Sequence, residues 1–175
     1  MRKNYRKAFP YLLDAAALGY VHAQNLVGYC YDLGLGVKRS KSAALFWYRQ
    51  AAKCNHREAL WNLALKYEKG EGVVVNNKKA FSFYKRAAEL GDAPAQCNLA
   101  VGYLEGLGTK QDLSKGIEWM RKAARKGDAK AQYNLGMAYL DGEGVKKNRR
   151  NARVWFETAL KQGHKKAIAA IRRAS

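Results

Sequence analysis

Small and apolar residues recur along the chain with a fixed spacing of 36 residues and without a gap. Alanine pairs begin at Ala15, Ala51, Ala87 and Ala123. Single alanines, tyrosines and two glycine columns share the spacing: Ala23, Ala59, Ala95, Ala131 and Ala167; Tyr31, Tyr67, Tyr103 and Tyr139; Gly34, Gly70, Gly106 and Gly142; Gly36, Gly72, Gly108 and Gly144. So many coincident columns define an internal repeat, which predicts an array of stacked supersecondary units.

Each repeat contains two apolar stripes with helical spacing. Between positions 44 and 52 the apolar residues fall at i, i+3, i+4, i+7 and i+8, which is one face of an α-helix. A second stripe follows between positions 59 and 67. The second repeat is therefore predicted to hold a helix over about 41–54, here called helix A, and another over about 57–69, called helix B.

Polar residues and glycines mark the predicted helix ends. The residue before each full helix A is a good N-cap: Ser40, Asn76, Asp112 and Asn148. The turn from helix A to helix B reads Gly-Asp in the later repeats, and Asn55-His56 and Gly163-His164 are weaker versions of it. The Gly-x-Gly loops lack the preceding strand and the lysine of a phosphate-binding loop, so they are interpreted as helix stops.

Helices of this length are marginal alone, so stacked neighbours must bury the stripes. The sequence predicts an all-α solenoid that forms a single domain over residues 1–175. The expected repeats cover about 5–40, 41–76, 77–112 and 113–148, with a partial repeat over 149–175. An aromatic column is expected in the core between layers: Tyr11, Trp47, Phe83, Trp119 and Trp155.

The later repeats resemble the Sel-like repeat (SLR) family, a relative of the tetratricopeptide repeats. The resemblance rests on the sequences at 95–100 and 131–139, followed by Gly142-Glu143-Gly144-Val145, and it covers residues 5–174. It implies a right-handed α/α superhelix. Members of this family mostly act as adaptors for other proteins, often in bacterial signalling, envelope homeostasis or host interaction. The resemblance therefore implies a non-enzymatic, bacterial-type adaptor or scaffold.

One branch of that family closes each hairpin with a cysteine pair, and some of its members are reported to bind or hydrolyse β-lactams. The three cysteines here, Cys30, Cys54 and Cys97, lack such pairs, so that chemistry is kept only as a minor alternative. The chain also carries no zinc-type cysteine spacing. None of its three histidines has a ligand-type partner four residues away on a helix. We therefore expect no catalytic residue, no metal site and no cofactor.

Charge adds a candidate binding surface. The chain has 33 Lys and Arg against 14 Asp and Glu, a net charge of +19, which attracts anions without identifying one. The outward positions of helix A carry one cation per repeat at Arg49, Lys85 and Arg121. We expect them to line a concave groove that binds an acidic peptide or protein surface, because arginine can pair with carboxylates bidentately. The candidate groove comprises Phe46, Arg49, Lys53, Lys85, Arg86, Arg121, Lys122 and Arg125. A solvated charged face is the alternative interpretation.

A second basic patch lies near the end of the chain, at a predicted loop and helix start. It comprises Lys146, Lys147, Arg149, Arg150 and Arg153. Cations oppose the helix dipole there, which suggests contact with an anion or a nucleic acid. Nucleic-acid or anionic-surface binding driven by the net charge is accordingly the second hypothesis for function. The chain has no run of 18 apolar residues and no apolar segment typical of a signal peptide, so we expect a cytoplasmic monomer without a membrane span.

Overall fold

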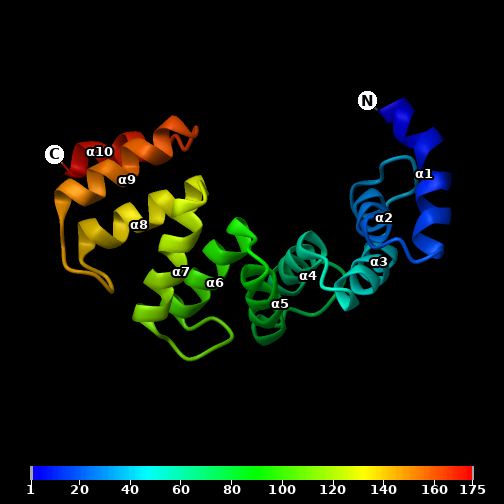
Figure 1. Cartoon of the computed structure of the whole chain (residues 1–175), viewed down its shortest axis with the longest axis horizontal. Helices are drawn as coiled ribbons and strands as arrows, with labels where there is room; N and C mark the ends of the chain where they lie inside the picture. The colour runs from blue at the N-terminus through cyan, green and yellow to red at the C-terminus, as the bar shows by residue number, and fades with distance from the viewer. Residues whose placement is uncertain (1, 175) are drawn as a thin grey trace. The chain divides into compact units, whose positions relative to one another are not determined.

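The computed structural model describes residues 2–174, with side chains from residue 4 onwards, and every regular element in that stretch is an α-helix (Figure 1). The helices are α1 (Arg2–Ala17), α2 (Val21–Leu33), α3 (Lys41–Lys53), α4 (Arg57–Lys69), α5 (Asn77–Glu89), α6 (Ala93–Glu105), α7 (Leu113–Arg125), α8 (Ala129–Asp141), α9 (Arg149–Lys161) and α10 (Ala167–Ala174). The helices predicted over 41–54 and 57–69 are α3 and α4, within one residue at each end. None of the described helices combines the length and the apolar character needed to cross a membrane.

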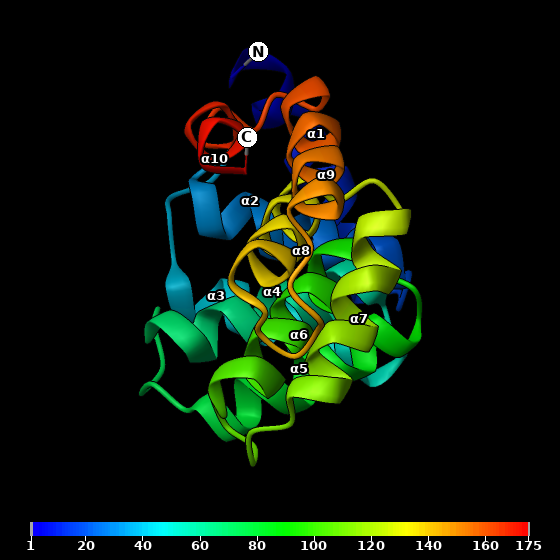
Figure 2. The same cartoon turned by 90° about the vertical axis from the view of Figure 1, so that its left-hand side faces the viewer.

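The chain divides into two compact units, residues 1–90 with α1 to α5 and residues 91–175 with α6 to α10. In both units, helices that are neighbours in the sequence pack against each other. In the first unit, α3 contacts α2 before it and α4 after it. In the second unit, α7 contacts α6 and α8, while α9 lies against α8 and α10 (Figure 2). The fold is an all-α solenoid, as predicted. The single domain expected over residues 1–175 stays a prediction.

The predicted N-caps of helix A are confirmed. Ser40 Oγ accepts a hydrogen bond from the backbone N–H of Ala43 at 3.2 Å, and Asp112 Oδ1 accepts one from Lys115 at 2.9 Å. Asn76 and Asn148 make the same contact at the starts of α5 and α9. Each cap satisfies one of the backbone donors that a helix start leaves free. The sequence thus places the start of each of these helices.

The turns between helix A and helix B also follow the sequence. Asp92 and Asp128 cap α6 and α8 through bonds of 2.8 and 2.7 Å to the N–H three residues on. His56 plays the same role for α4, where its Nδ1 lies 3.4 Å from the N–H of Ala59. The preceding residue, Asn55, has a φ of 55°, the left-handed conformation that glycine adopts at this place in the later turns.

The core of each unit is built from the repeating alanines and from large side chains of both helices of each repeat. Ala51, Ala87 and Ala123 have no exposed surface. On the A helices the large buried residues stand one position after the predicted aromatic column, at Tyr48, Tyr84, Met120 and Phe156. The predicted column itself, apart from Tyr11, is only half-buried, at Trp47, Phe83, Trp119 and Trp155.

Tyr11 contradicts the expectation of a core aromatic column, because its side chain is 77% exposed. The later residues of that column sit on helices that follow a helix B. Within the described residues, α1 has no helix before it, and the helix it contacts most is α2. The prediction was wrong here because a periodic pattern assigns the same neighbours to every repeat.

Small residues allow helix B to approach the following helix A closely. A Cβ atom added to Gly28 of α2 would lie 2.7 Å from the ring of Tyr48 on α3. A Cβ added to Gly136 of α8 would lie 2.5 Å from the ring of Phe156 on α9. Such separations are shorter than van der Waals contact, so the rings of Tyr48 and Phe156 occupy space that a glycine leaves free.

Candidate functional site

The basic column of helix A is held in the same way in both units. In the first unit, the guanidinium of Arg49 on α3 donates a hydrogen bond of 3.2 Å from Nη2 to the Tyr67 hydroxyl on α4. In the second unit, Arg121 on α7 donates an identical 3.2 Å bond to the Tyr139 hydroxyl on α8. The acceptor is a neutral phenol, and within the described residues neither arginine forms an ion pair. Each guanidinium therefore keeps its full charge and unused N–H donors.

The other candidate residues of the first unit differ in what holds them. Phe46 is 52% exposed, with its ring edge-to-face against Trp47 at 5.1 Å between centroids. Lys53 donates to the Gln50 side-chain oxygen at 3.0 Å. Lys85 lies 3.9 Å from Glu89 one turn away, an exposed pair of little energetic weight.

The Arg86 side chain links α5 to the end of α3 and the turn that follows it. Its Nη2 donates to the backbone carbonyl of Ala52 at 2.9 Å and to the Asn55 side-chain oxygen at 2.7 Å. Both acceptors lie where α3 turns into α4, so Arg86 fastens α5 to the turn between the preceding helices. We infer that its substitution would disturb packing as well as any ligand contact.

In the second unit, the Lys122 side chain forms an ion pair and a cation–π contact. Its Nζ lies 2.7 Å from a carboxylate oxygen of Glu118 and 4.2 Å from the centre of the Trp119 ring. The ammonium is thus partly neutralised and held over an aromatic face. Arg125 is exposed at the end of α7. Of the candidate cations on these helices, only Lys85 and Lys122 have a carboxylate partner among the described residues.

The second basic patch surrounds the start of α9, where Asn148 is the N-cap. The predicted cations are all exposed: Lys146, Lys147, Arg149, Arg150 and Arg153. Arg153 pairs with Glu157 one turn away at 2.8 Å. The patch is therefore accessible, but the helix start and exposed cations alone do not define a ligand.

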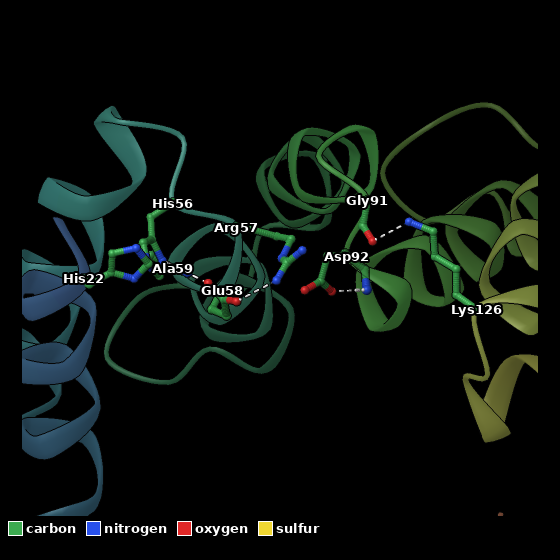
Figure 3. Close-up of polar contacts among 9 residues, drawn as sticks. His22, His56, Arg57, Glu58, Ala59, Gly91, Asp92 and Lys126 are labelled. Atoms are coloured by element: carbon green, nitrogen blue, oxygen red, sulfur yellow. Dashed lines mark hydrogen bonds and ion pairs between the residues drawn. The ribbon is translucent and has the colours of Figure 1, made fainter.

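A histidine pair that the sequence did not predict lies in the first unit. His56 Nε2 and His22 Nδ1 are 2.9 Å apart, and the two rings meet edge to face (Figure 3). Glu58 Oε2 lies 3.2 Å from the other ring nitrogen of His56, and Arg57 pairs with Glu58 at 3.0 Å. Burial lowers the pKa of His56, and His22 and Arg57 add to this effect while Glu58 opposes it. The sequence search considered partners only along one helix and so missed a pair formed between repeats.

The histidine pair borders an open hollow of about 460 Å³. Its lining residues are Val21, His22, Cys54, Asn55, His56, Arg57, Glu58 and Leu90. Across the described residues, no three His, Cys, Asp or Glu side chains are grouped to hold a metal ion. All three cysteines are free thiols, and Cys54 is the exposed one.

Comparison with known proteins identifies the repeat. The Sel1 repeat family matches this chain at residues 1–20, 21–56, 57–92, 93–128 and 129–164. The chain belongs to the Sel1 repeat family. Sel1 repeat proteins generally mediate protein–protein interactions, and their fold is typically a non-enzymatic scaffold.

Three solved structures of Sel1-type proteins are similar to this chain. A Sel1 repeat protein from Oxalobacter formigenes is 36% identical with a TM-score of 0.87, over 97% of this chain and 70% of that one. A protective antigen of uropathogenic Escherichia coli with an SLR fold is 37% identical with a TM-score of 0.85. That match covers 89% of this chain but only 33% of the antigen, so this chain spans about a third of that protein's length. Helicobacter pylori cysteine rich protein B is 27% identical with a TM-score of 0.59, over 76% of this chain and 96% of that one.

Proposed function

We propose that this Sel1 repeat chain is a non-enzymatic adaptor that binds an acidic segment of a partner protein through the basic columns of its A helices. The observation that carries the proposal is the repeated bond from arginine to tyrosine. Arg49 and Arg121 are oriented by a neutral hydroxyl instead of a carboxylate, so their charge and their remaining donors are available to a ligand. A purely solvated face would not need the same orienting contact in both units.

The proposed ligand has acidic side chains at regular intervals. In the first unit, Arg49 on α3 and Lys85 on α5 belong to successive A helices, and α4 contacts both of these helices. An extended peptide advances about 3.3 Å per residue, so a ligand with acidic residues several positions apart could place carboxylates against both of these cations. The exposed ring of Phe46 next to Arg49 would add one apolar contact, which favours a ligand with a hydrophobic residue among the acids.

The test uses a fluorescein-labelled peptide with glutamate at every third position. Reversing Arg49, Lys85 and Arg121 to glutamate should weaken binding by more than about tenfold, since charge-assisted contacts become repulsive. The matched control reverses Lys165, Lys166 and Arg172, which changes the net charge equally. It should weaken binding only by about twofold, through long-range electrostatics that salt screens.

Two outcomes would count against the proposal. If the control reversal is the more damaging, the basic C-terminal segment is the better candidate for the site. If a single-stranded DNA binds tightly, loses affinity log-linearly with salt and responds equally to both reversals, the net charge drives a nucleic-acid interaction instead.

A further inference from the structure

Three helices of the first unit place two cations beside the phenol of Tyr67. Arg49 on α3 donates a hydrogen bond of 3.2 Å to the Tyr67 hydroxyl on α4. Lys79 on α5 holds its Nζ 5.3 Å from the centre of the same ring. Phe83, one turn after Lys79, stacks on the ring with 5.7 Å between centroids and 16° between planes, which fixes the orientation of the phenol. Arg49, Tyr67 and Lys79 are here called the Tyr67 cluster.

Both cations of the Tyr67 cluster are exposed, and neither forms an ion pair within the described residues. The acidic residues between positions 41 and 90 are few: Glu58, Glu68, Glu71 and Glu89. Glu58 and Glu89 lie at the ends of α4 and α5 that are remote from Tyr67 and Lys79. Glu68 accepts a hydrogen bond of 2.6 Å from the Tyr84 hydroxyl, and Glu71 lies 2.6 Å from Lys66 Nζ. None of these carboxylates pairs with Arg49 or Lys79.

The next repeat shows how the same lysine position can be neutralised. Lys115 on α7 corresponds to Lys79, and its Nζ lies 5.8 Å from the centre of the Tyr103 ring. There, however, the ammonium pairs with the helix cap Asp112 at 2.9 Å. The corresponding cap of α5 is Asn76, which is uncharged. The ammonium of Lys79 therefore keeps a charge that Asp112 compensates in the next repeat.

The second unit repeats the bond from arginine to tyrosine without the second cation. Arg121 donates to the Tyr139 hydroxyl at 3.2 Å, as Arg49 does to Tyr67. The residue of α9 that corresponds to Lys79 is Asn151, which is uncharged. The Tyr67 cluster thus holds one more positive charge than its counterpart around Tyr139.

The groups of the Tyr67 cluster suit a doubly charged anion. The Tyr67 oxygen accepts the bond from Arg49, so the hydroxyl proton is available for donation to a ligand. The guanidinium has further N–H donors, and the ammonium supplies a second charge. A phosphorylated side chain carries a charge of about −1.5 to −2 at pH 7 and three strong acceptor oxygens, whereas a carboxylate carries one charge and two oxygens.

We propose that the Tyr67 cluster binds the phosphoryl group of a phosphorylated serine or threonine within the acidic segment of the partner. This inference rests on the adaptor function proposed above, because Arg49 belongs to the same basic column. The phosphoryl oxygens accept hydrogen bonds from the Arg49 guanidinium and the Tyr67 hydroxyl and pair with the Lys79 ammonium. Phosphorylation of the partner would then strengthen its binding to this chain.

The test compares fluorescein-labelled peptides that share glutamates at every third position and differ only at one central position, which holds serine, glutamate or phosphoserine. Binding to the full chain is measured by fluorescence anisotropy in about 150 mM sodium chloride, where attraction beyond about 8 Å is largely screened. The phosphoserine peptide should bind at least about fivefold more tightly than the glutamate peptide, because it offers a second charge and a further oxygen. The serine peptide should bind most weakly.

Two matched variants locate the phosphoryl site. Lys79→Gln should reduce the preference for phosphoserine over glutamate to below about twofold, since one of the two cations is lost. Lys78→Gln removes the same charge from the neighbouring exposed residue of α5, which makes no ion pair within the described residues, so the preference should remain. Far-UV circular dichroism checks that both variants are folded.

A competition experiment separates a phosphopeptide from free phosphate. Unlabelled phosphoserine peptide should displace the labelled one at a concentration at least about a hundredfold lower than inorganic phosphate, because the flanking glutamates contribute to binding only in the peptide. Displacement by both at similar concentrations would identify the free ion as the ligand and overturn the assignment to a peptide.

The other outcomes distinguish this inference from the proposed function. Equal affinity for the phosphoserine and glutamate peptides would refute the phosphoryl site and leave the adaptor function standing. An equal loss of preference in Lys78→Gln and Lys79→Gln would do the same, because it would show an effect of diffuse charge. If none of the peptides binds, both proposals are wrong.

Discussion

At the residue scale, one buried lysine forms ion pairs that connect α2, α4 and the loop after α4 in the first unit. Lys66 on α4 is 6% exposed, and its Nζ lies 2.6 Å from both Asp32 at the end of α2 and Glu71 in the loop after α4. The hydrogen bond from Lys66 also lowers the pKa of Glu71. The equivalent positions in the other repeats hold Cys30, Gly102 and Ala138. A lysine in a column of small residues is thus a visible signal in the sequence, but its partners come from other elements.

Removing this cation should be costly. Lys66→Met would leave two neighbouring carboxylates without their counter-ion, so we expect a loss of about 2–4 kcal/mol in the free energy of unfolding. The matched control is Lys69→Met on the same helix, where the side chain is exposed and the expected change is below about 0.5 kcal/mol. Urea unfolding followed by circular dichroism measures both. Similar values for the two variants would contradict a stabilising role for the buried cluster.

His56 combines two roles that a single sequence pattern does not reveal. Its place before α4 predicts an N-cap, and the bond to the N–H of Ala59 confirms that role. The contact with His22 links helices that begin 36 residues apart, so it depends on how the repeats stack. Sequence reasoning found the first role because it is local and missed the second because it is not.

The lowered pKa of His56 predicts acid sensitivity. The folded state binds fewer protons at this residue than the unfolded state, so lowering the pH through the ordinary histidine range near 6.5 favours unfolding. Stability should be complete above that range and decline below it. His56→Asn keeps an N-cap without a titrating ring, so its free energy of unfolding should fall less between about pH 7 and pH 5. Identical pH profiles for the two proteins would exclude His56 as the source.

At the scale of helices, the sequence predicts boundaries well and depth of burial less well. The starts of α3, α5, α7 and α9 follow directly from their N-caps because capping is a contact over three residues. The basic column was also visible in the sequence, but the hydrogen bonds from Arg49 to Tyr67 and from Arg121 to Tyr139 were not, because they form between two helices. The apolar stripe of helix A includes both Trp47 and Tyr48, so the sequence alone does not show which of the two is buried more deeply. We expected Trp47 in the core, but Tyr48 is the buried residue. Which residue is buried depends on the preceding helix, where Gly28 leaves space for the Tyr48 ring.

The alanine pair of helix A provides a test of this packing. Ala88 on α5 is 1% exposed, so Ala88→Leu should overpack the contact and cost about 1–3 kcal/mol of folding stability. Ser82→Leu on the same helix lies at an exposed position and should cost less than about 0.5 kcal/mol. Chemical denaturation of both variants gives the comparison. Equal costs would mean that the buried face of helix A is assigned incorrectly.

At the scale of the whole molecule, 33 Lys and Arg stand against 14 Asp and Glu, and the ion pairs of Lys85, Lys122 and Arg153 are exposed. Self-repulsion of this kind opposes the folded state at low ionic strength. The family and fold do not require it, since charge affects solubility and association more than topology. We therefore relate the excess of cations to the acidic ligand proposed above and not to the architecture.

Moderate salt should stabilise the protein. Raising sodium chloride from about 10 mM to about 150 mM shortens the screening length to about 8 Å and weakens the repulsion. The melting temperature should rise by about 2–4 °C for each kcal/mol of repulsion that is removed. Thermal scans at 222 nm measure it, and a parallel series in choline chloride separates screening from specific binding of sodium. A melting temperature that falls in both salts would show that the exposed ion pairs outweigh the repulsion.

The different burial of the three cysteines offers a route to spectroscopy. Burial raises the pKa of Cys97 to about 12 and also raises that of Cys30, so neither presents a reactive thiolate near neutral pH. Cys54 is exposed and lines the hollow beside His22 and His56. A maleimide dye should therefore attach at a single position of the native chain without any engineered cysteine. Such a label would report on events near the histidine pair and on the tumbling of the first unit when a partner binds.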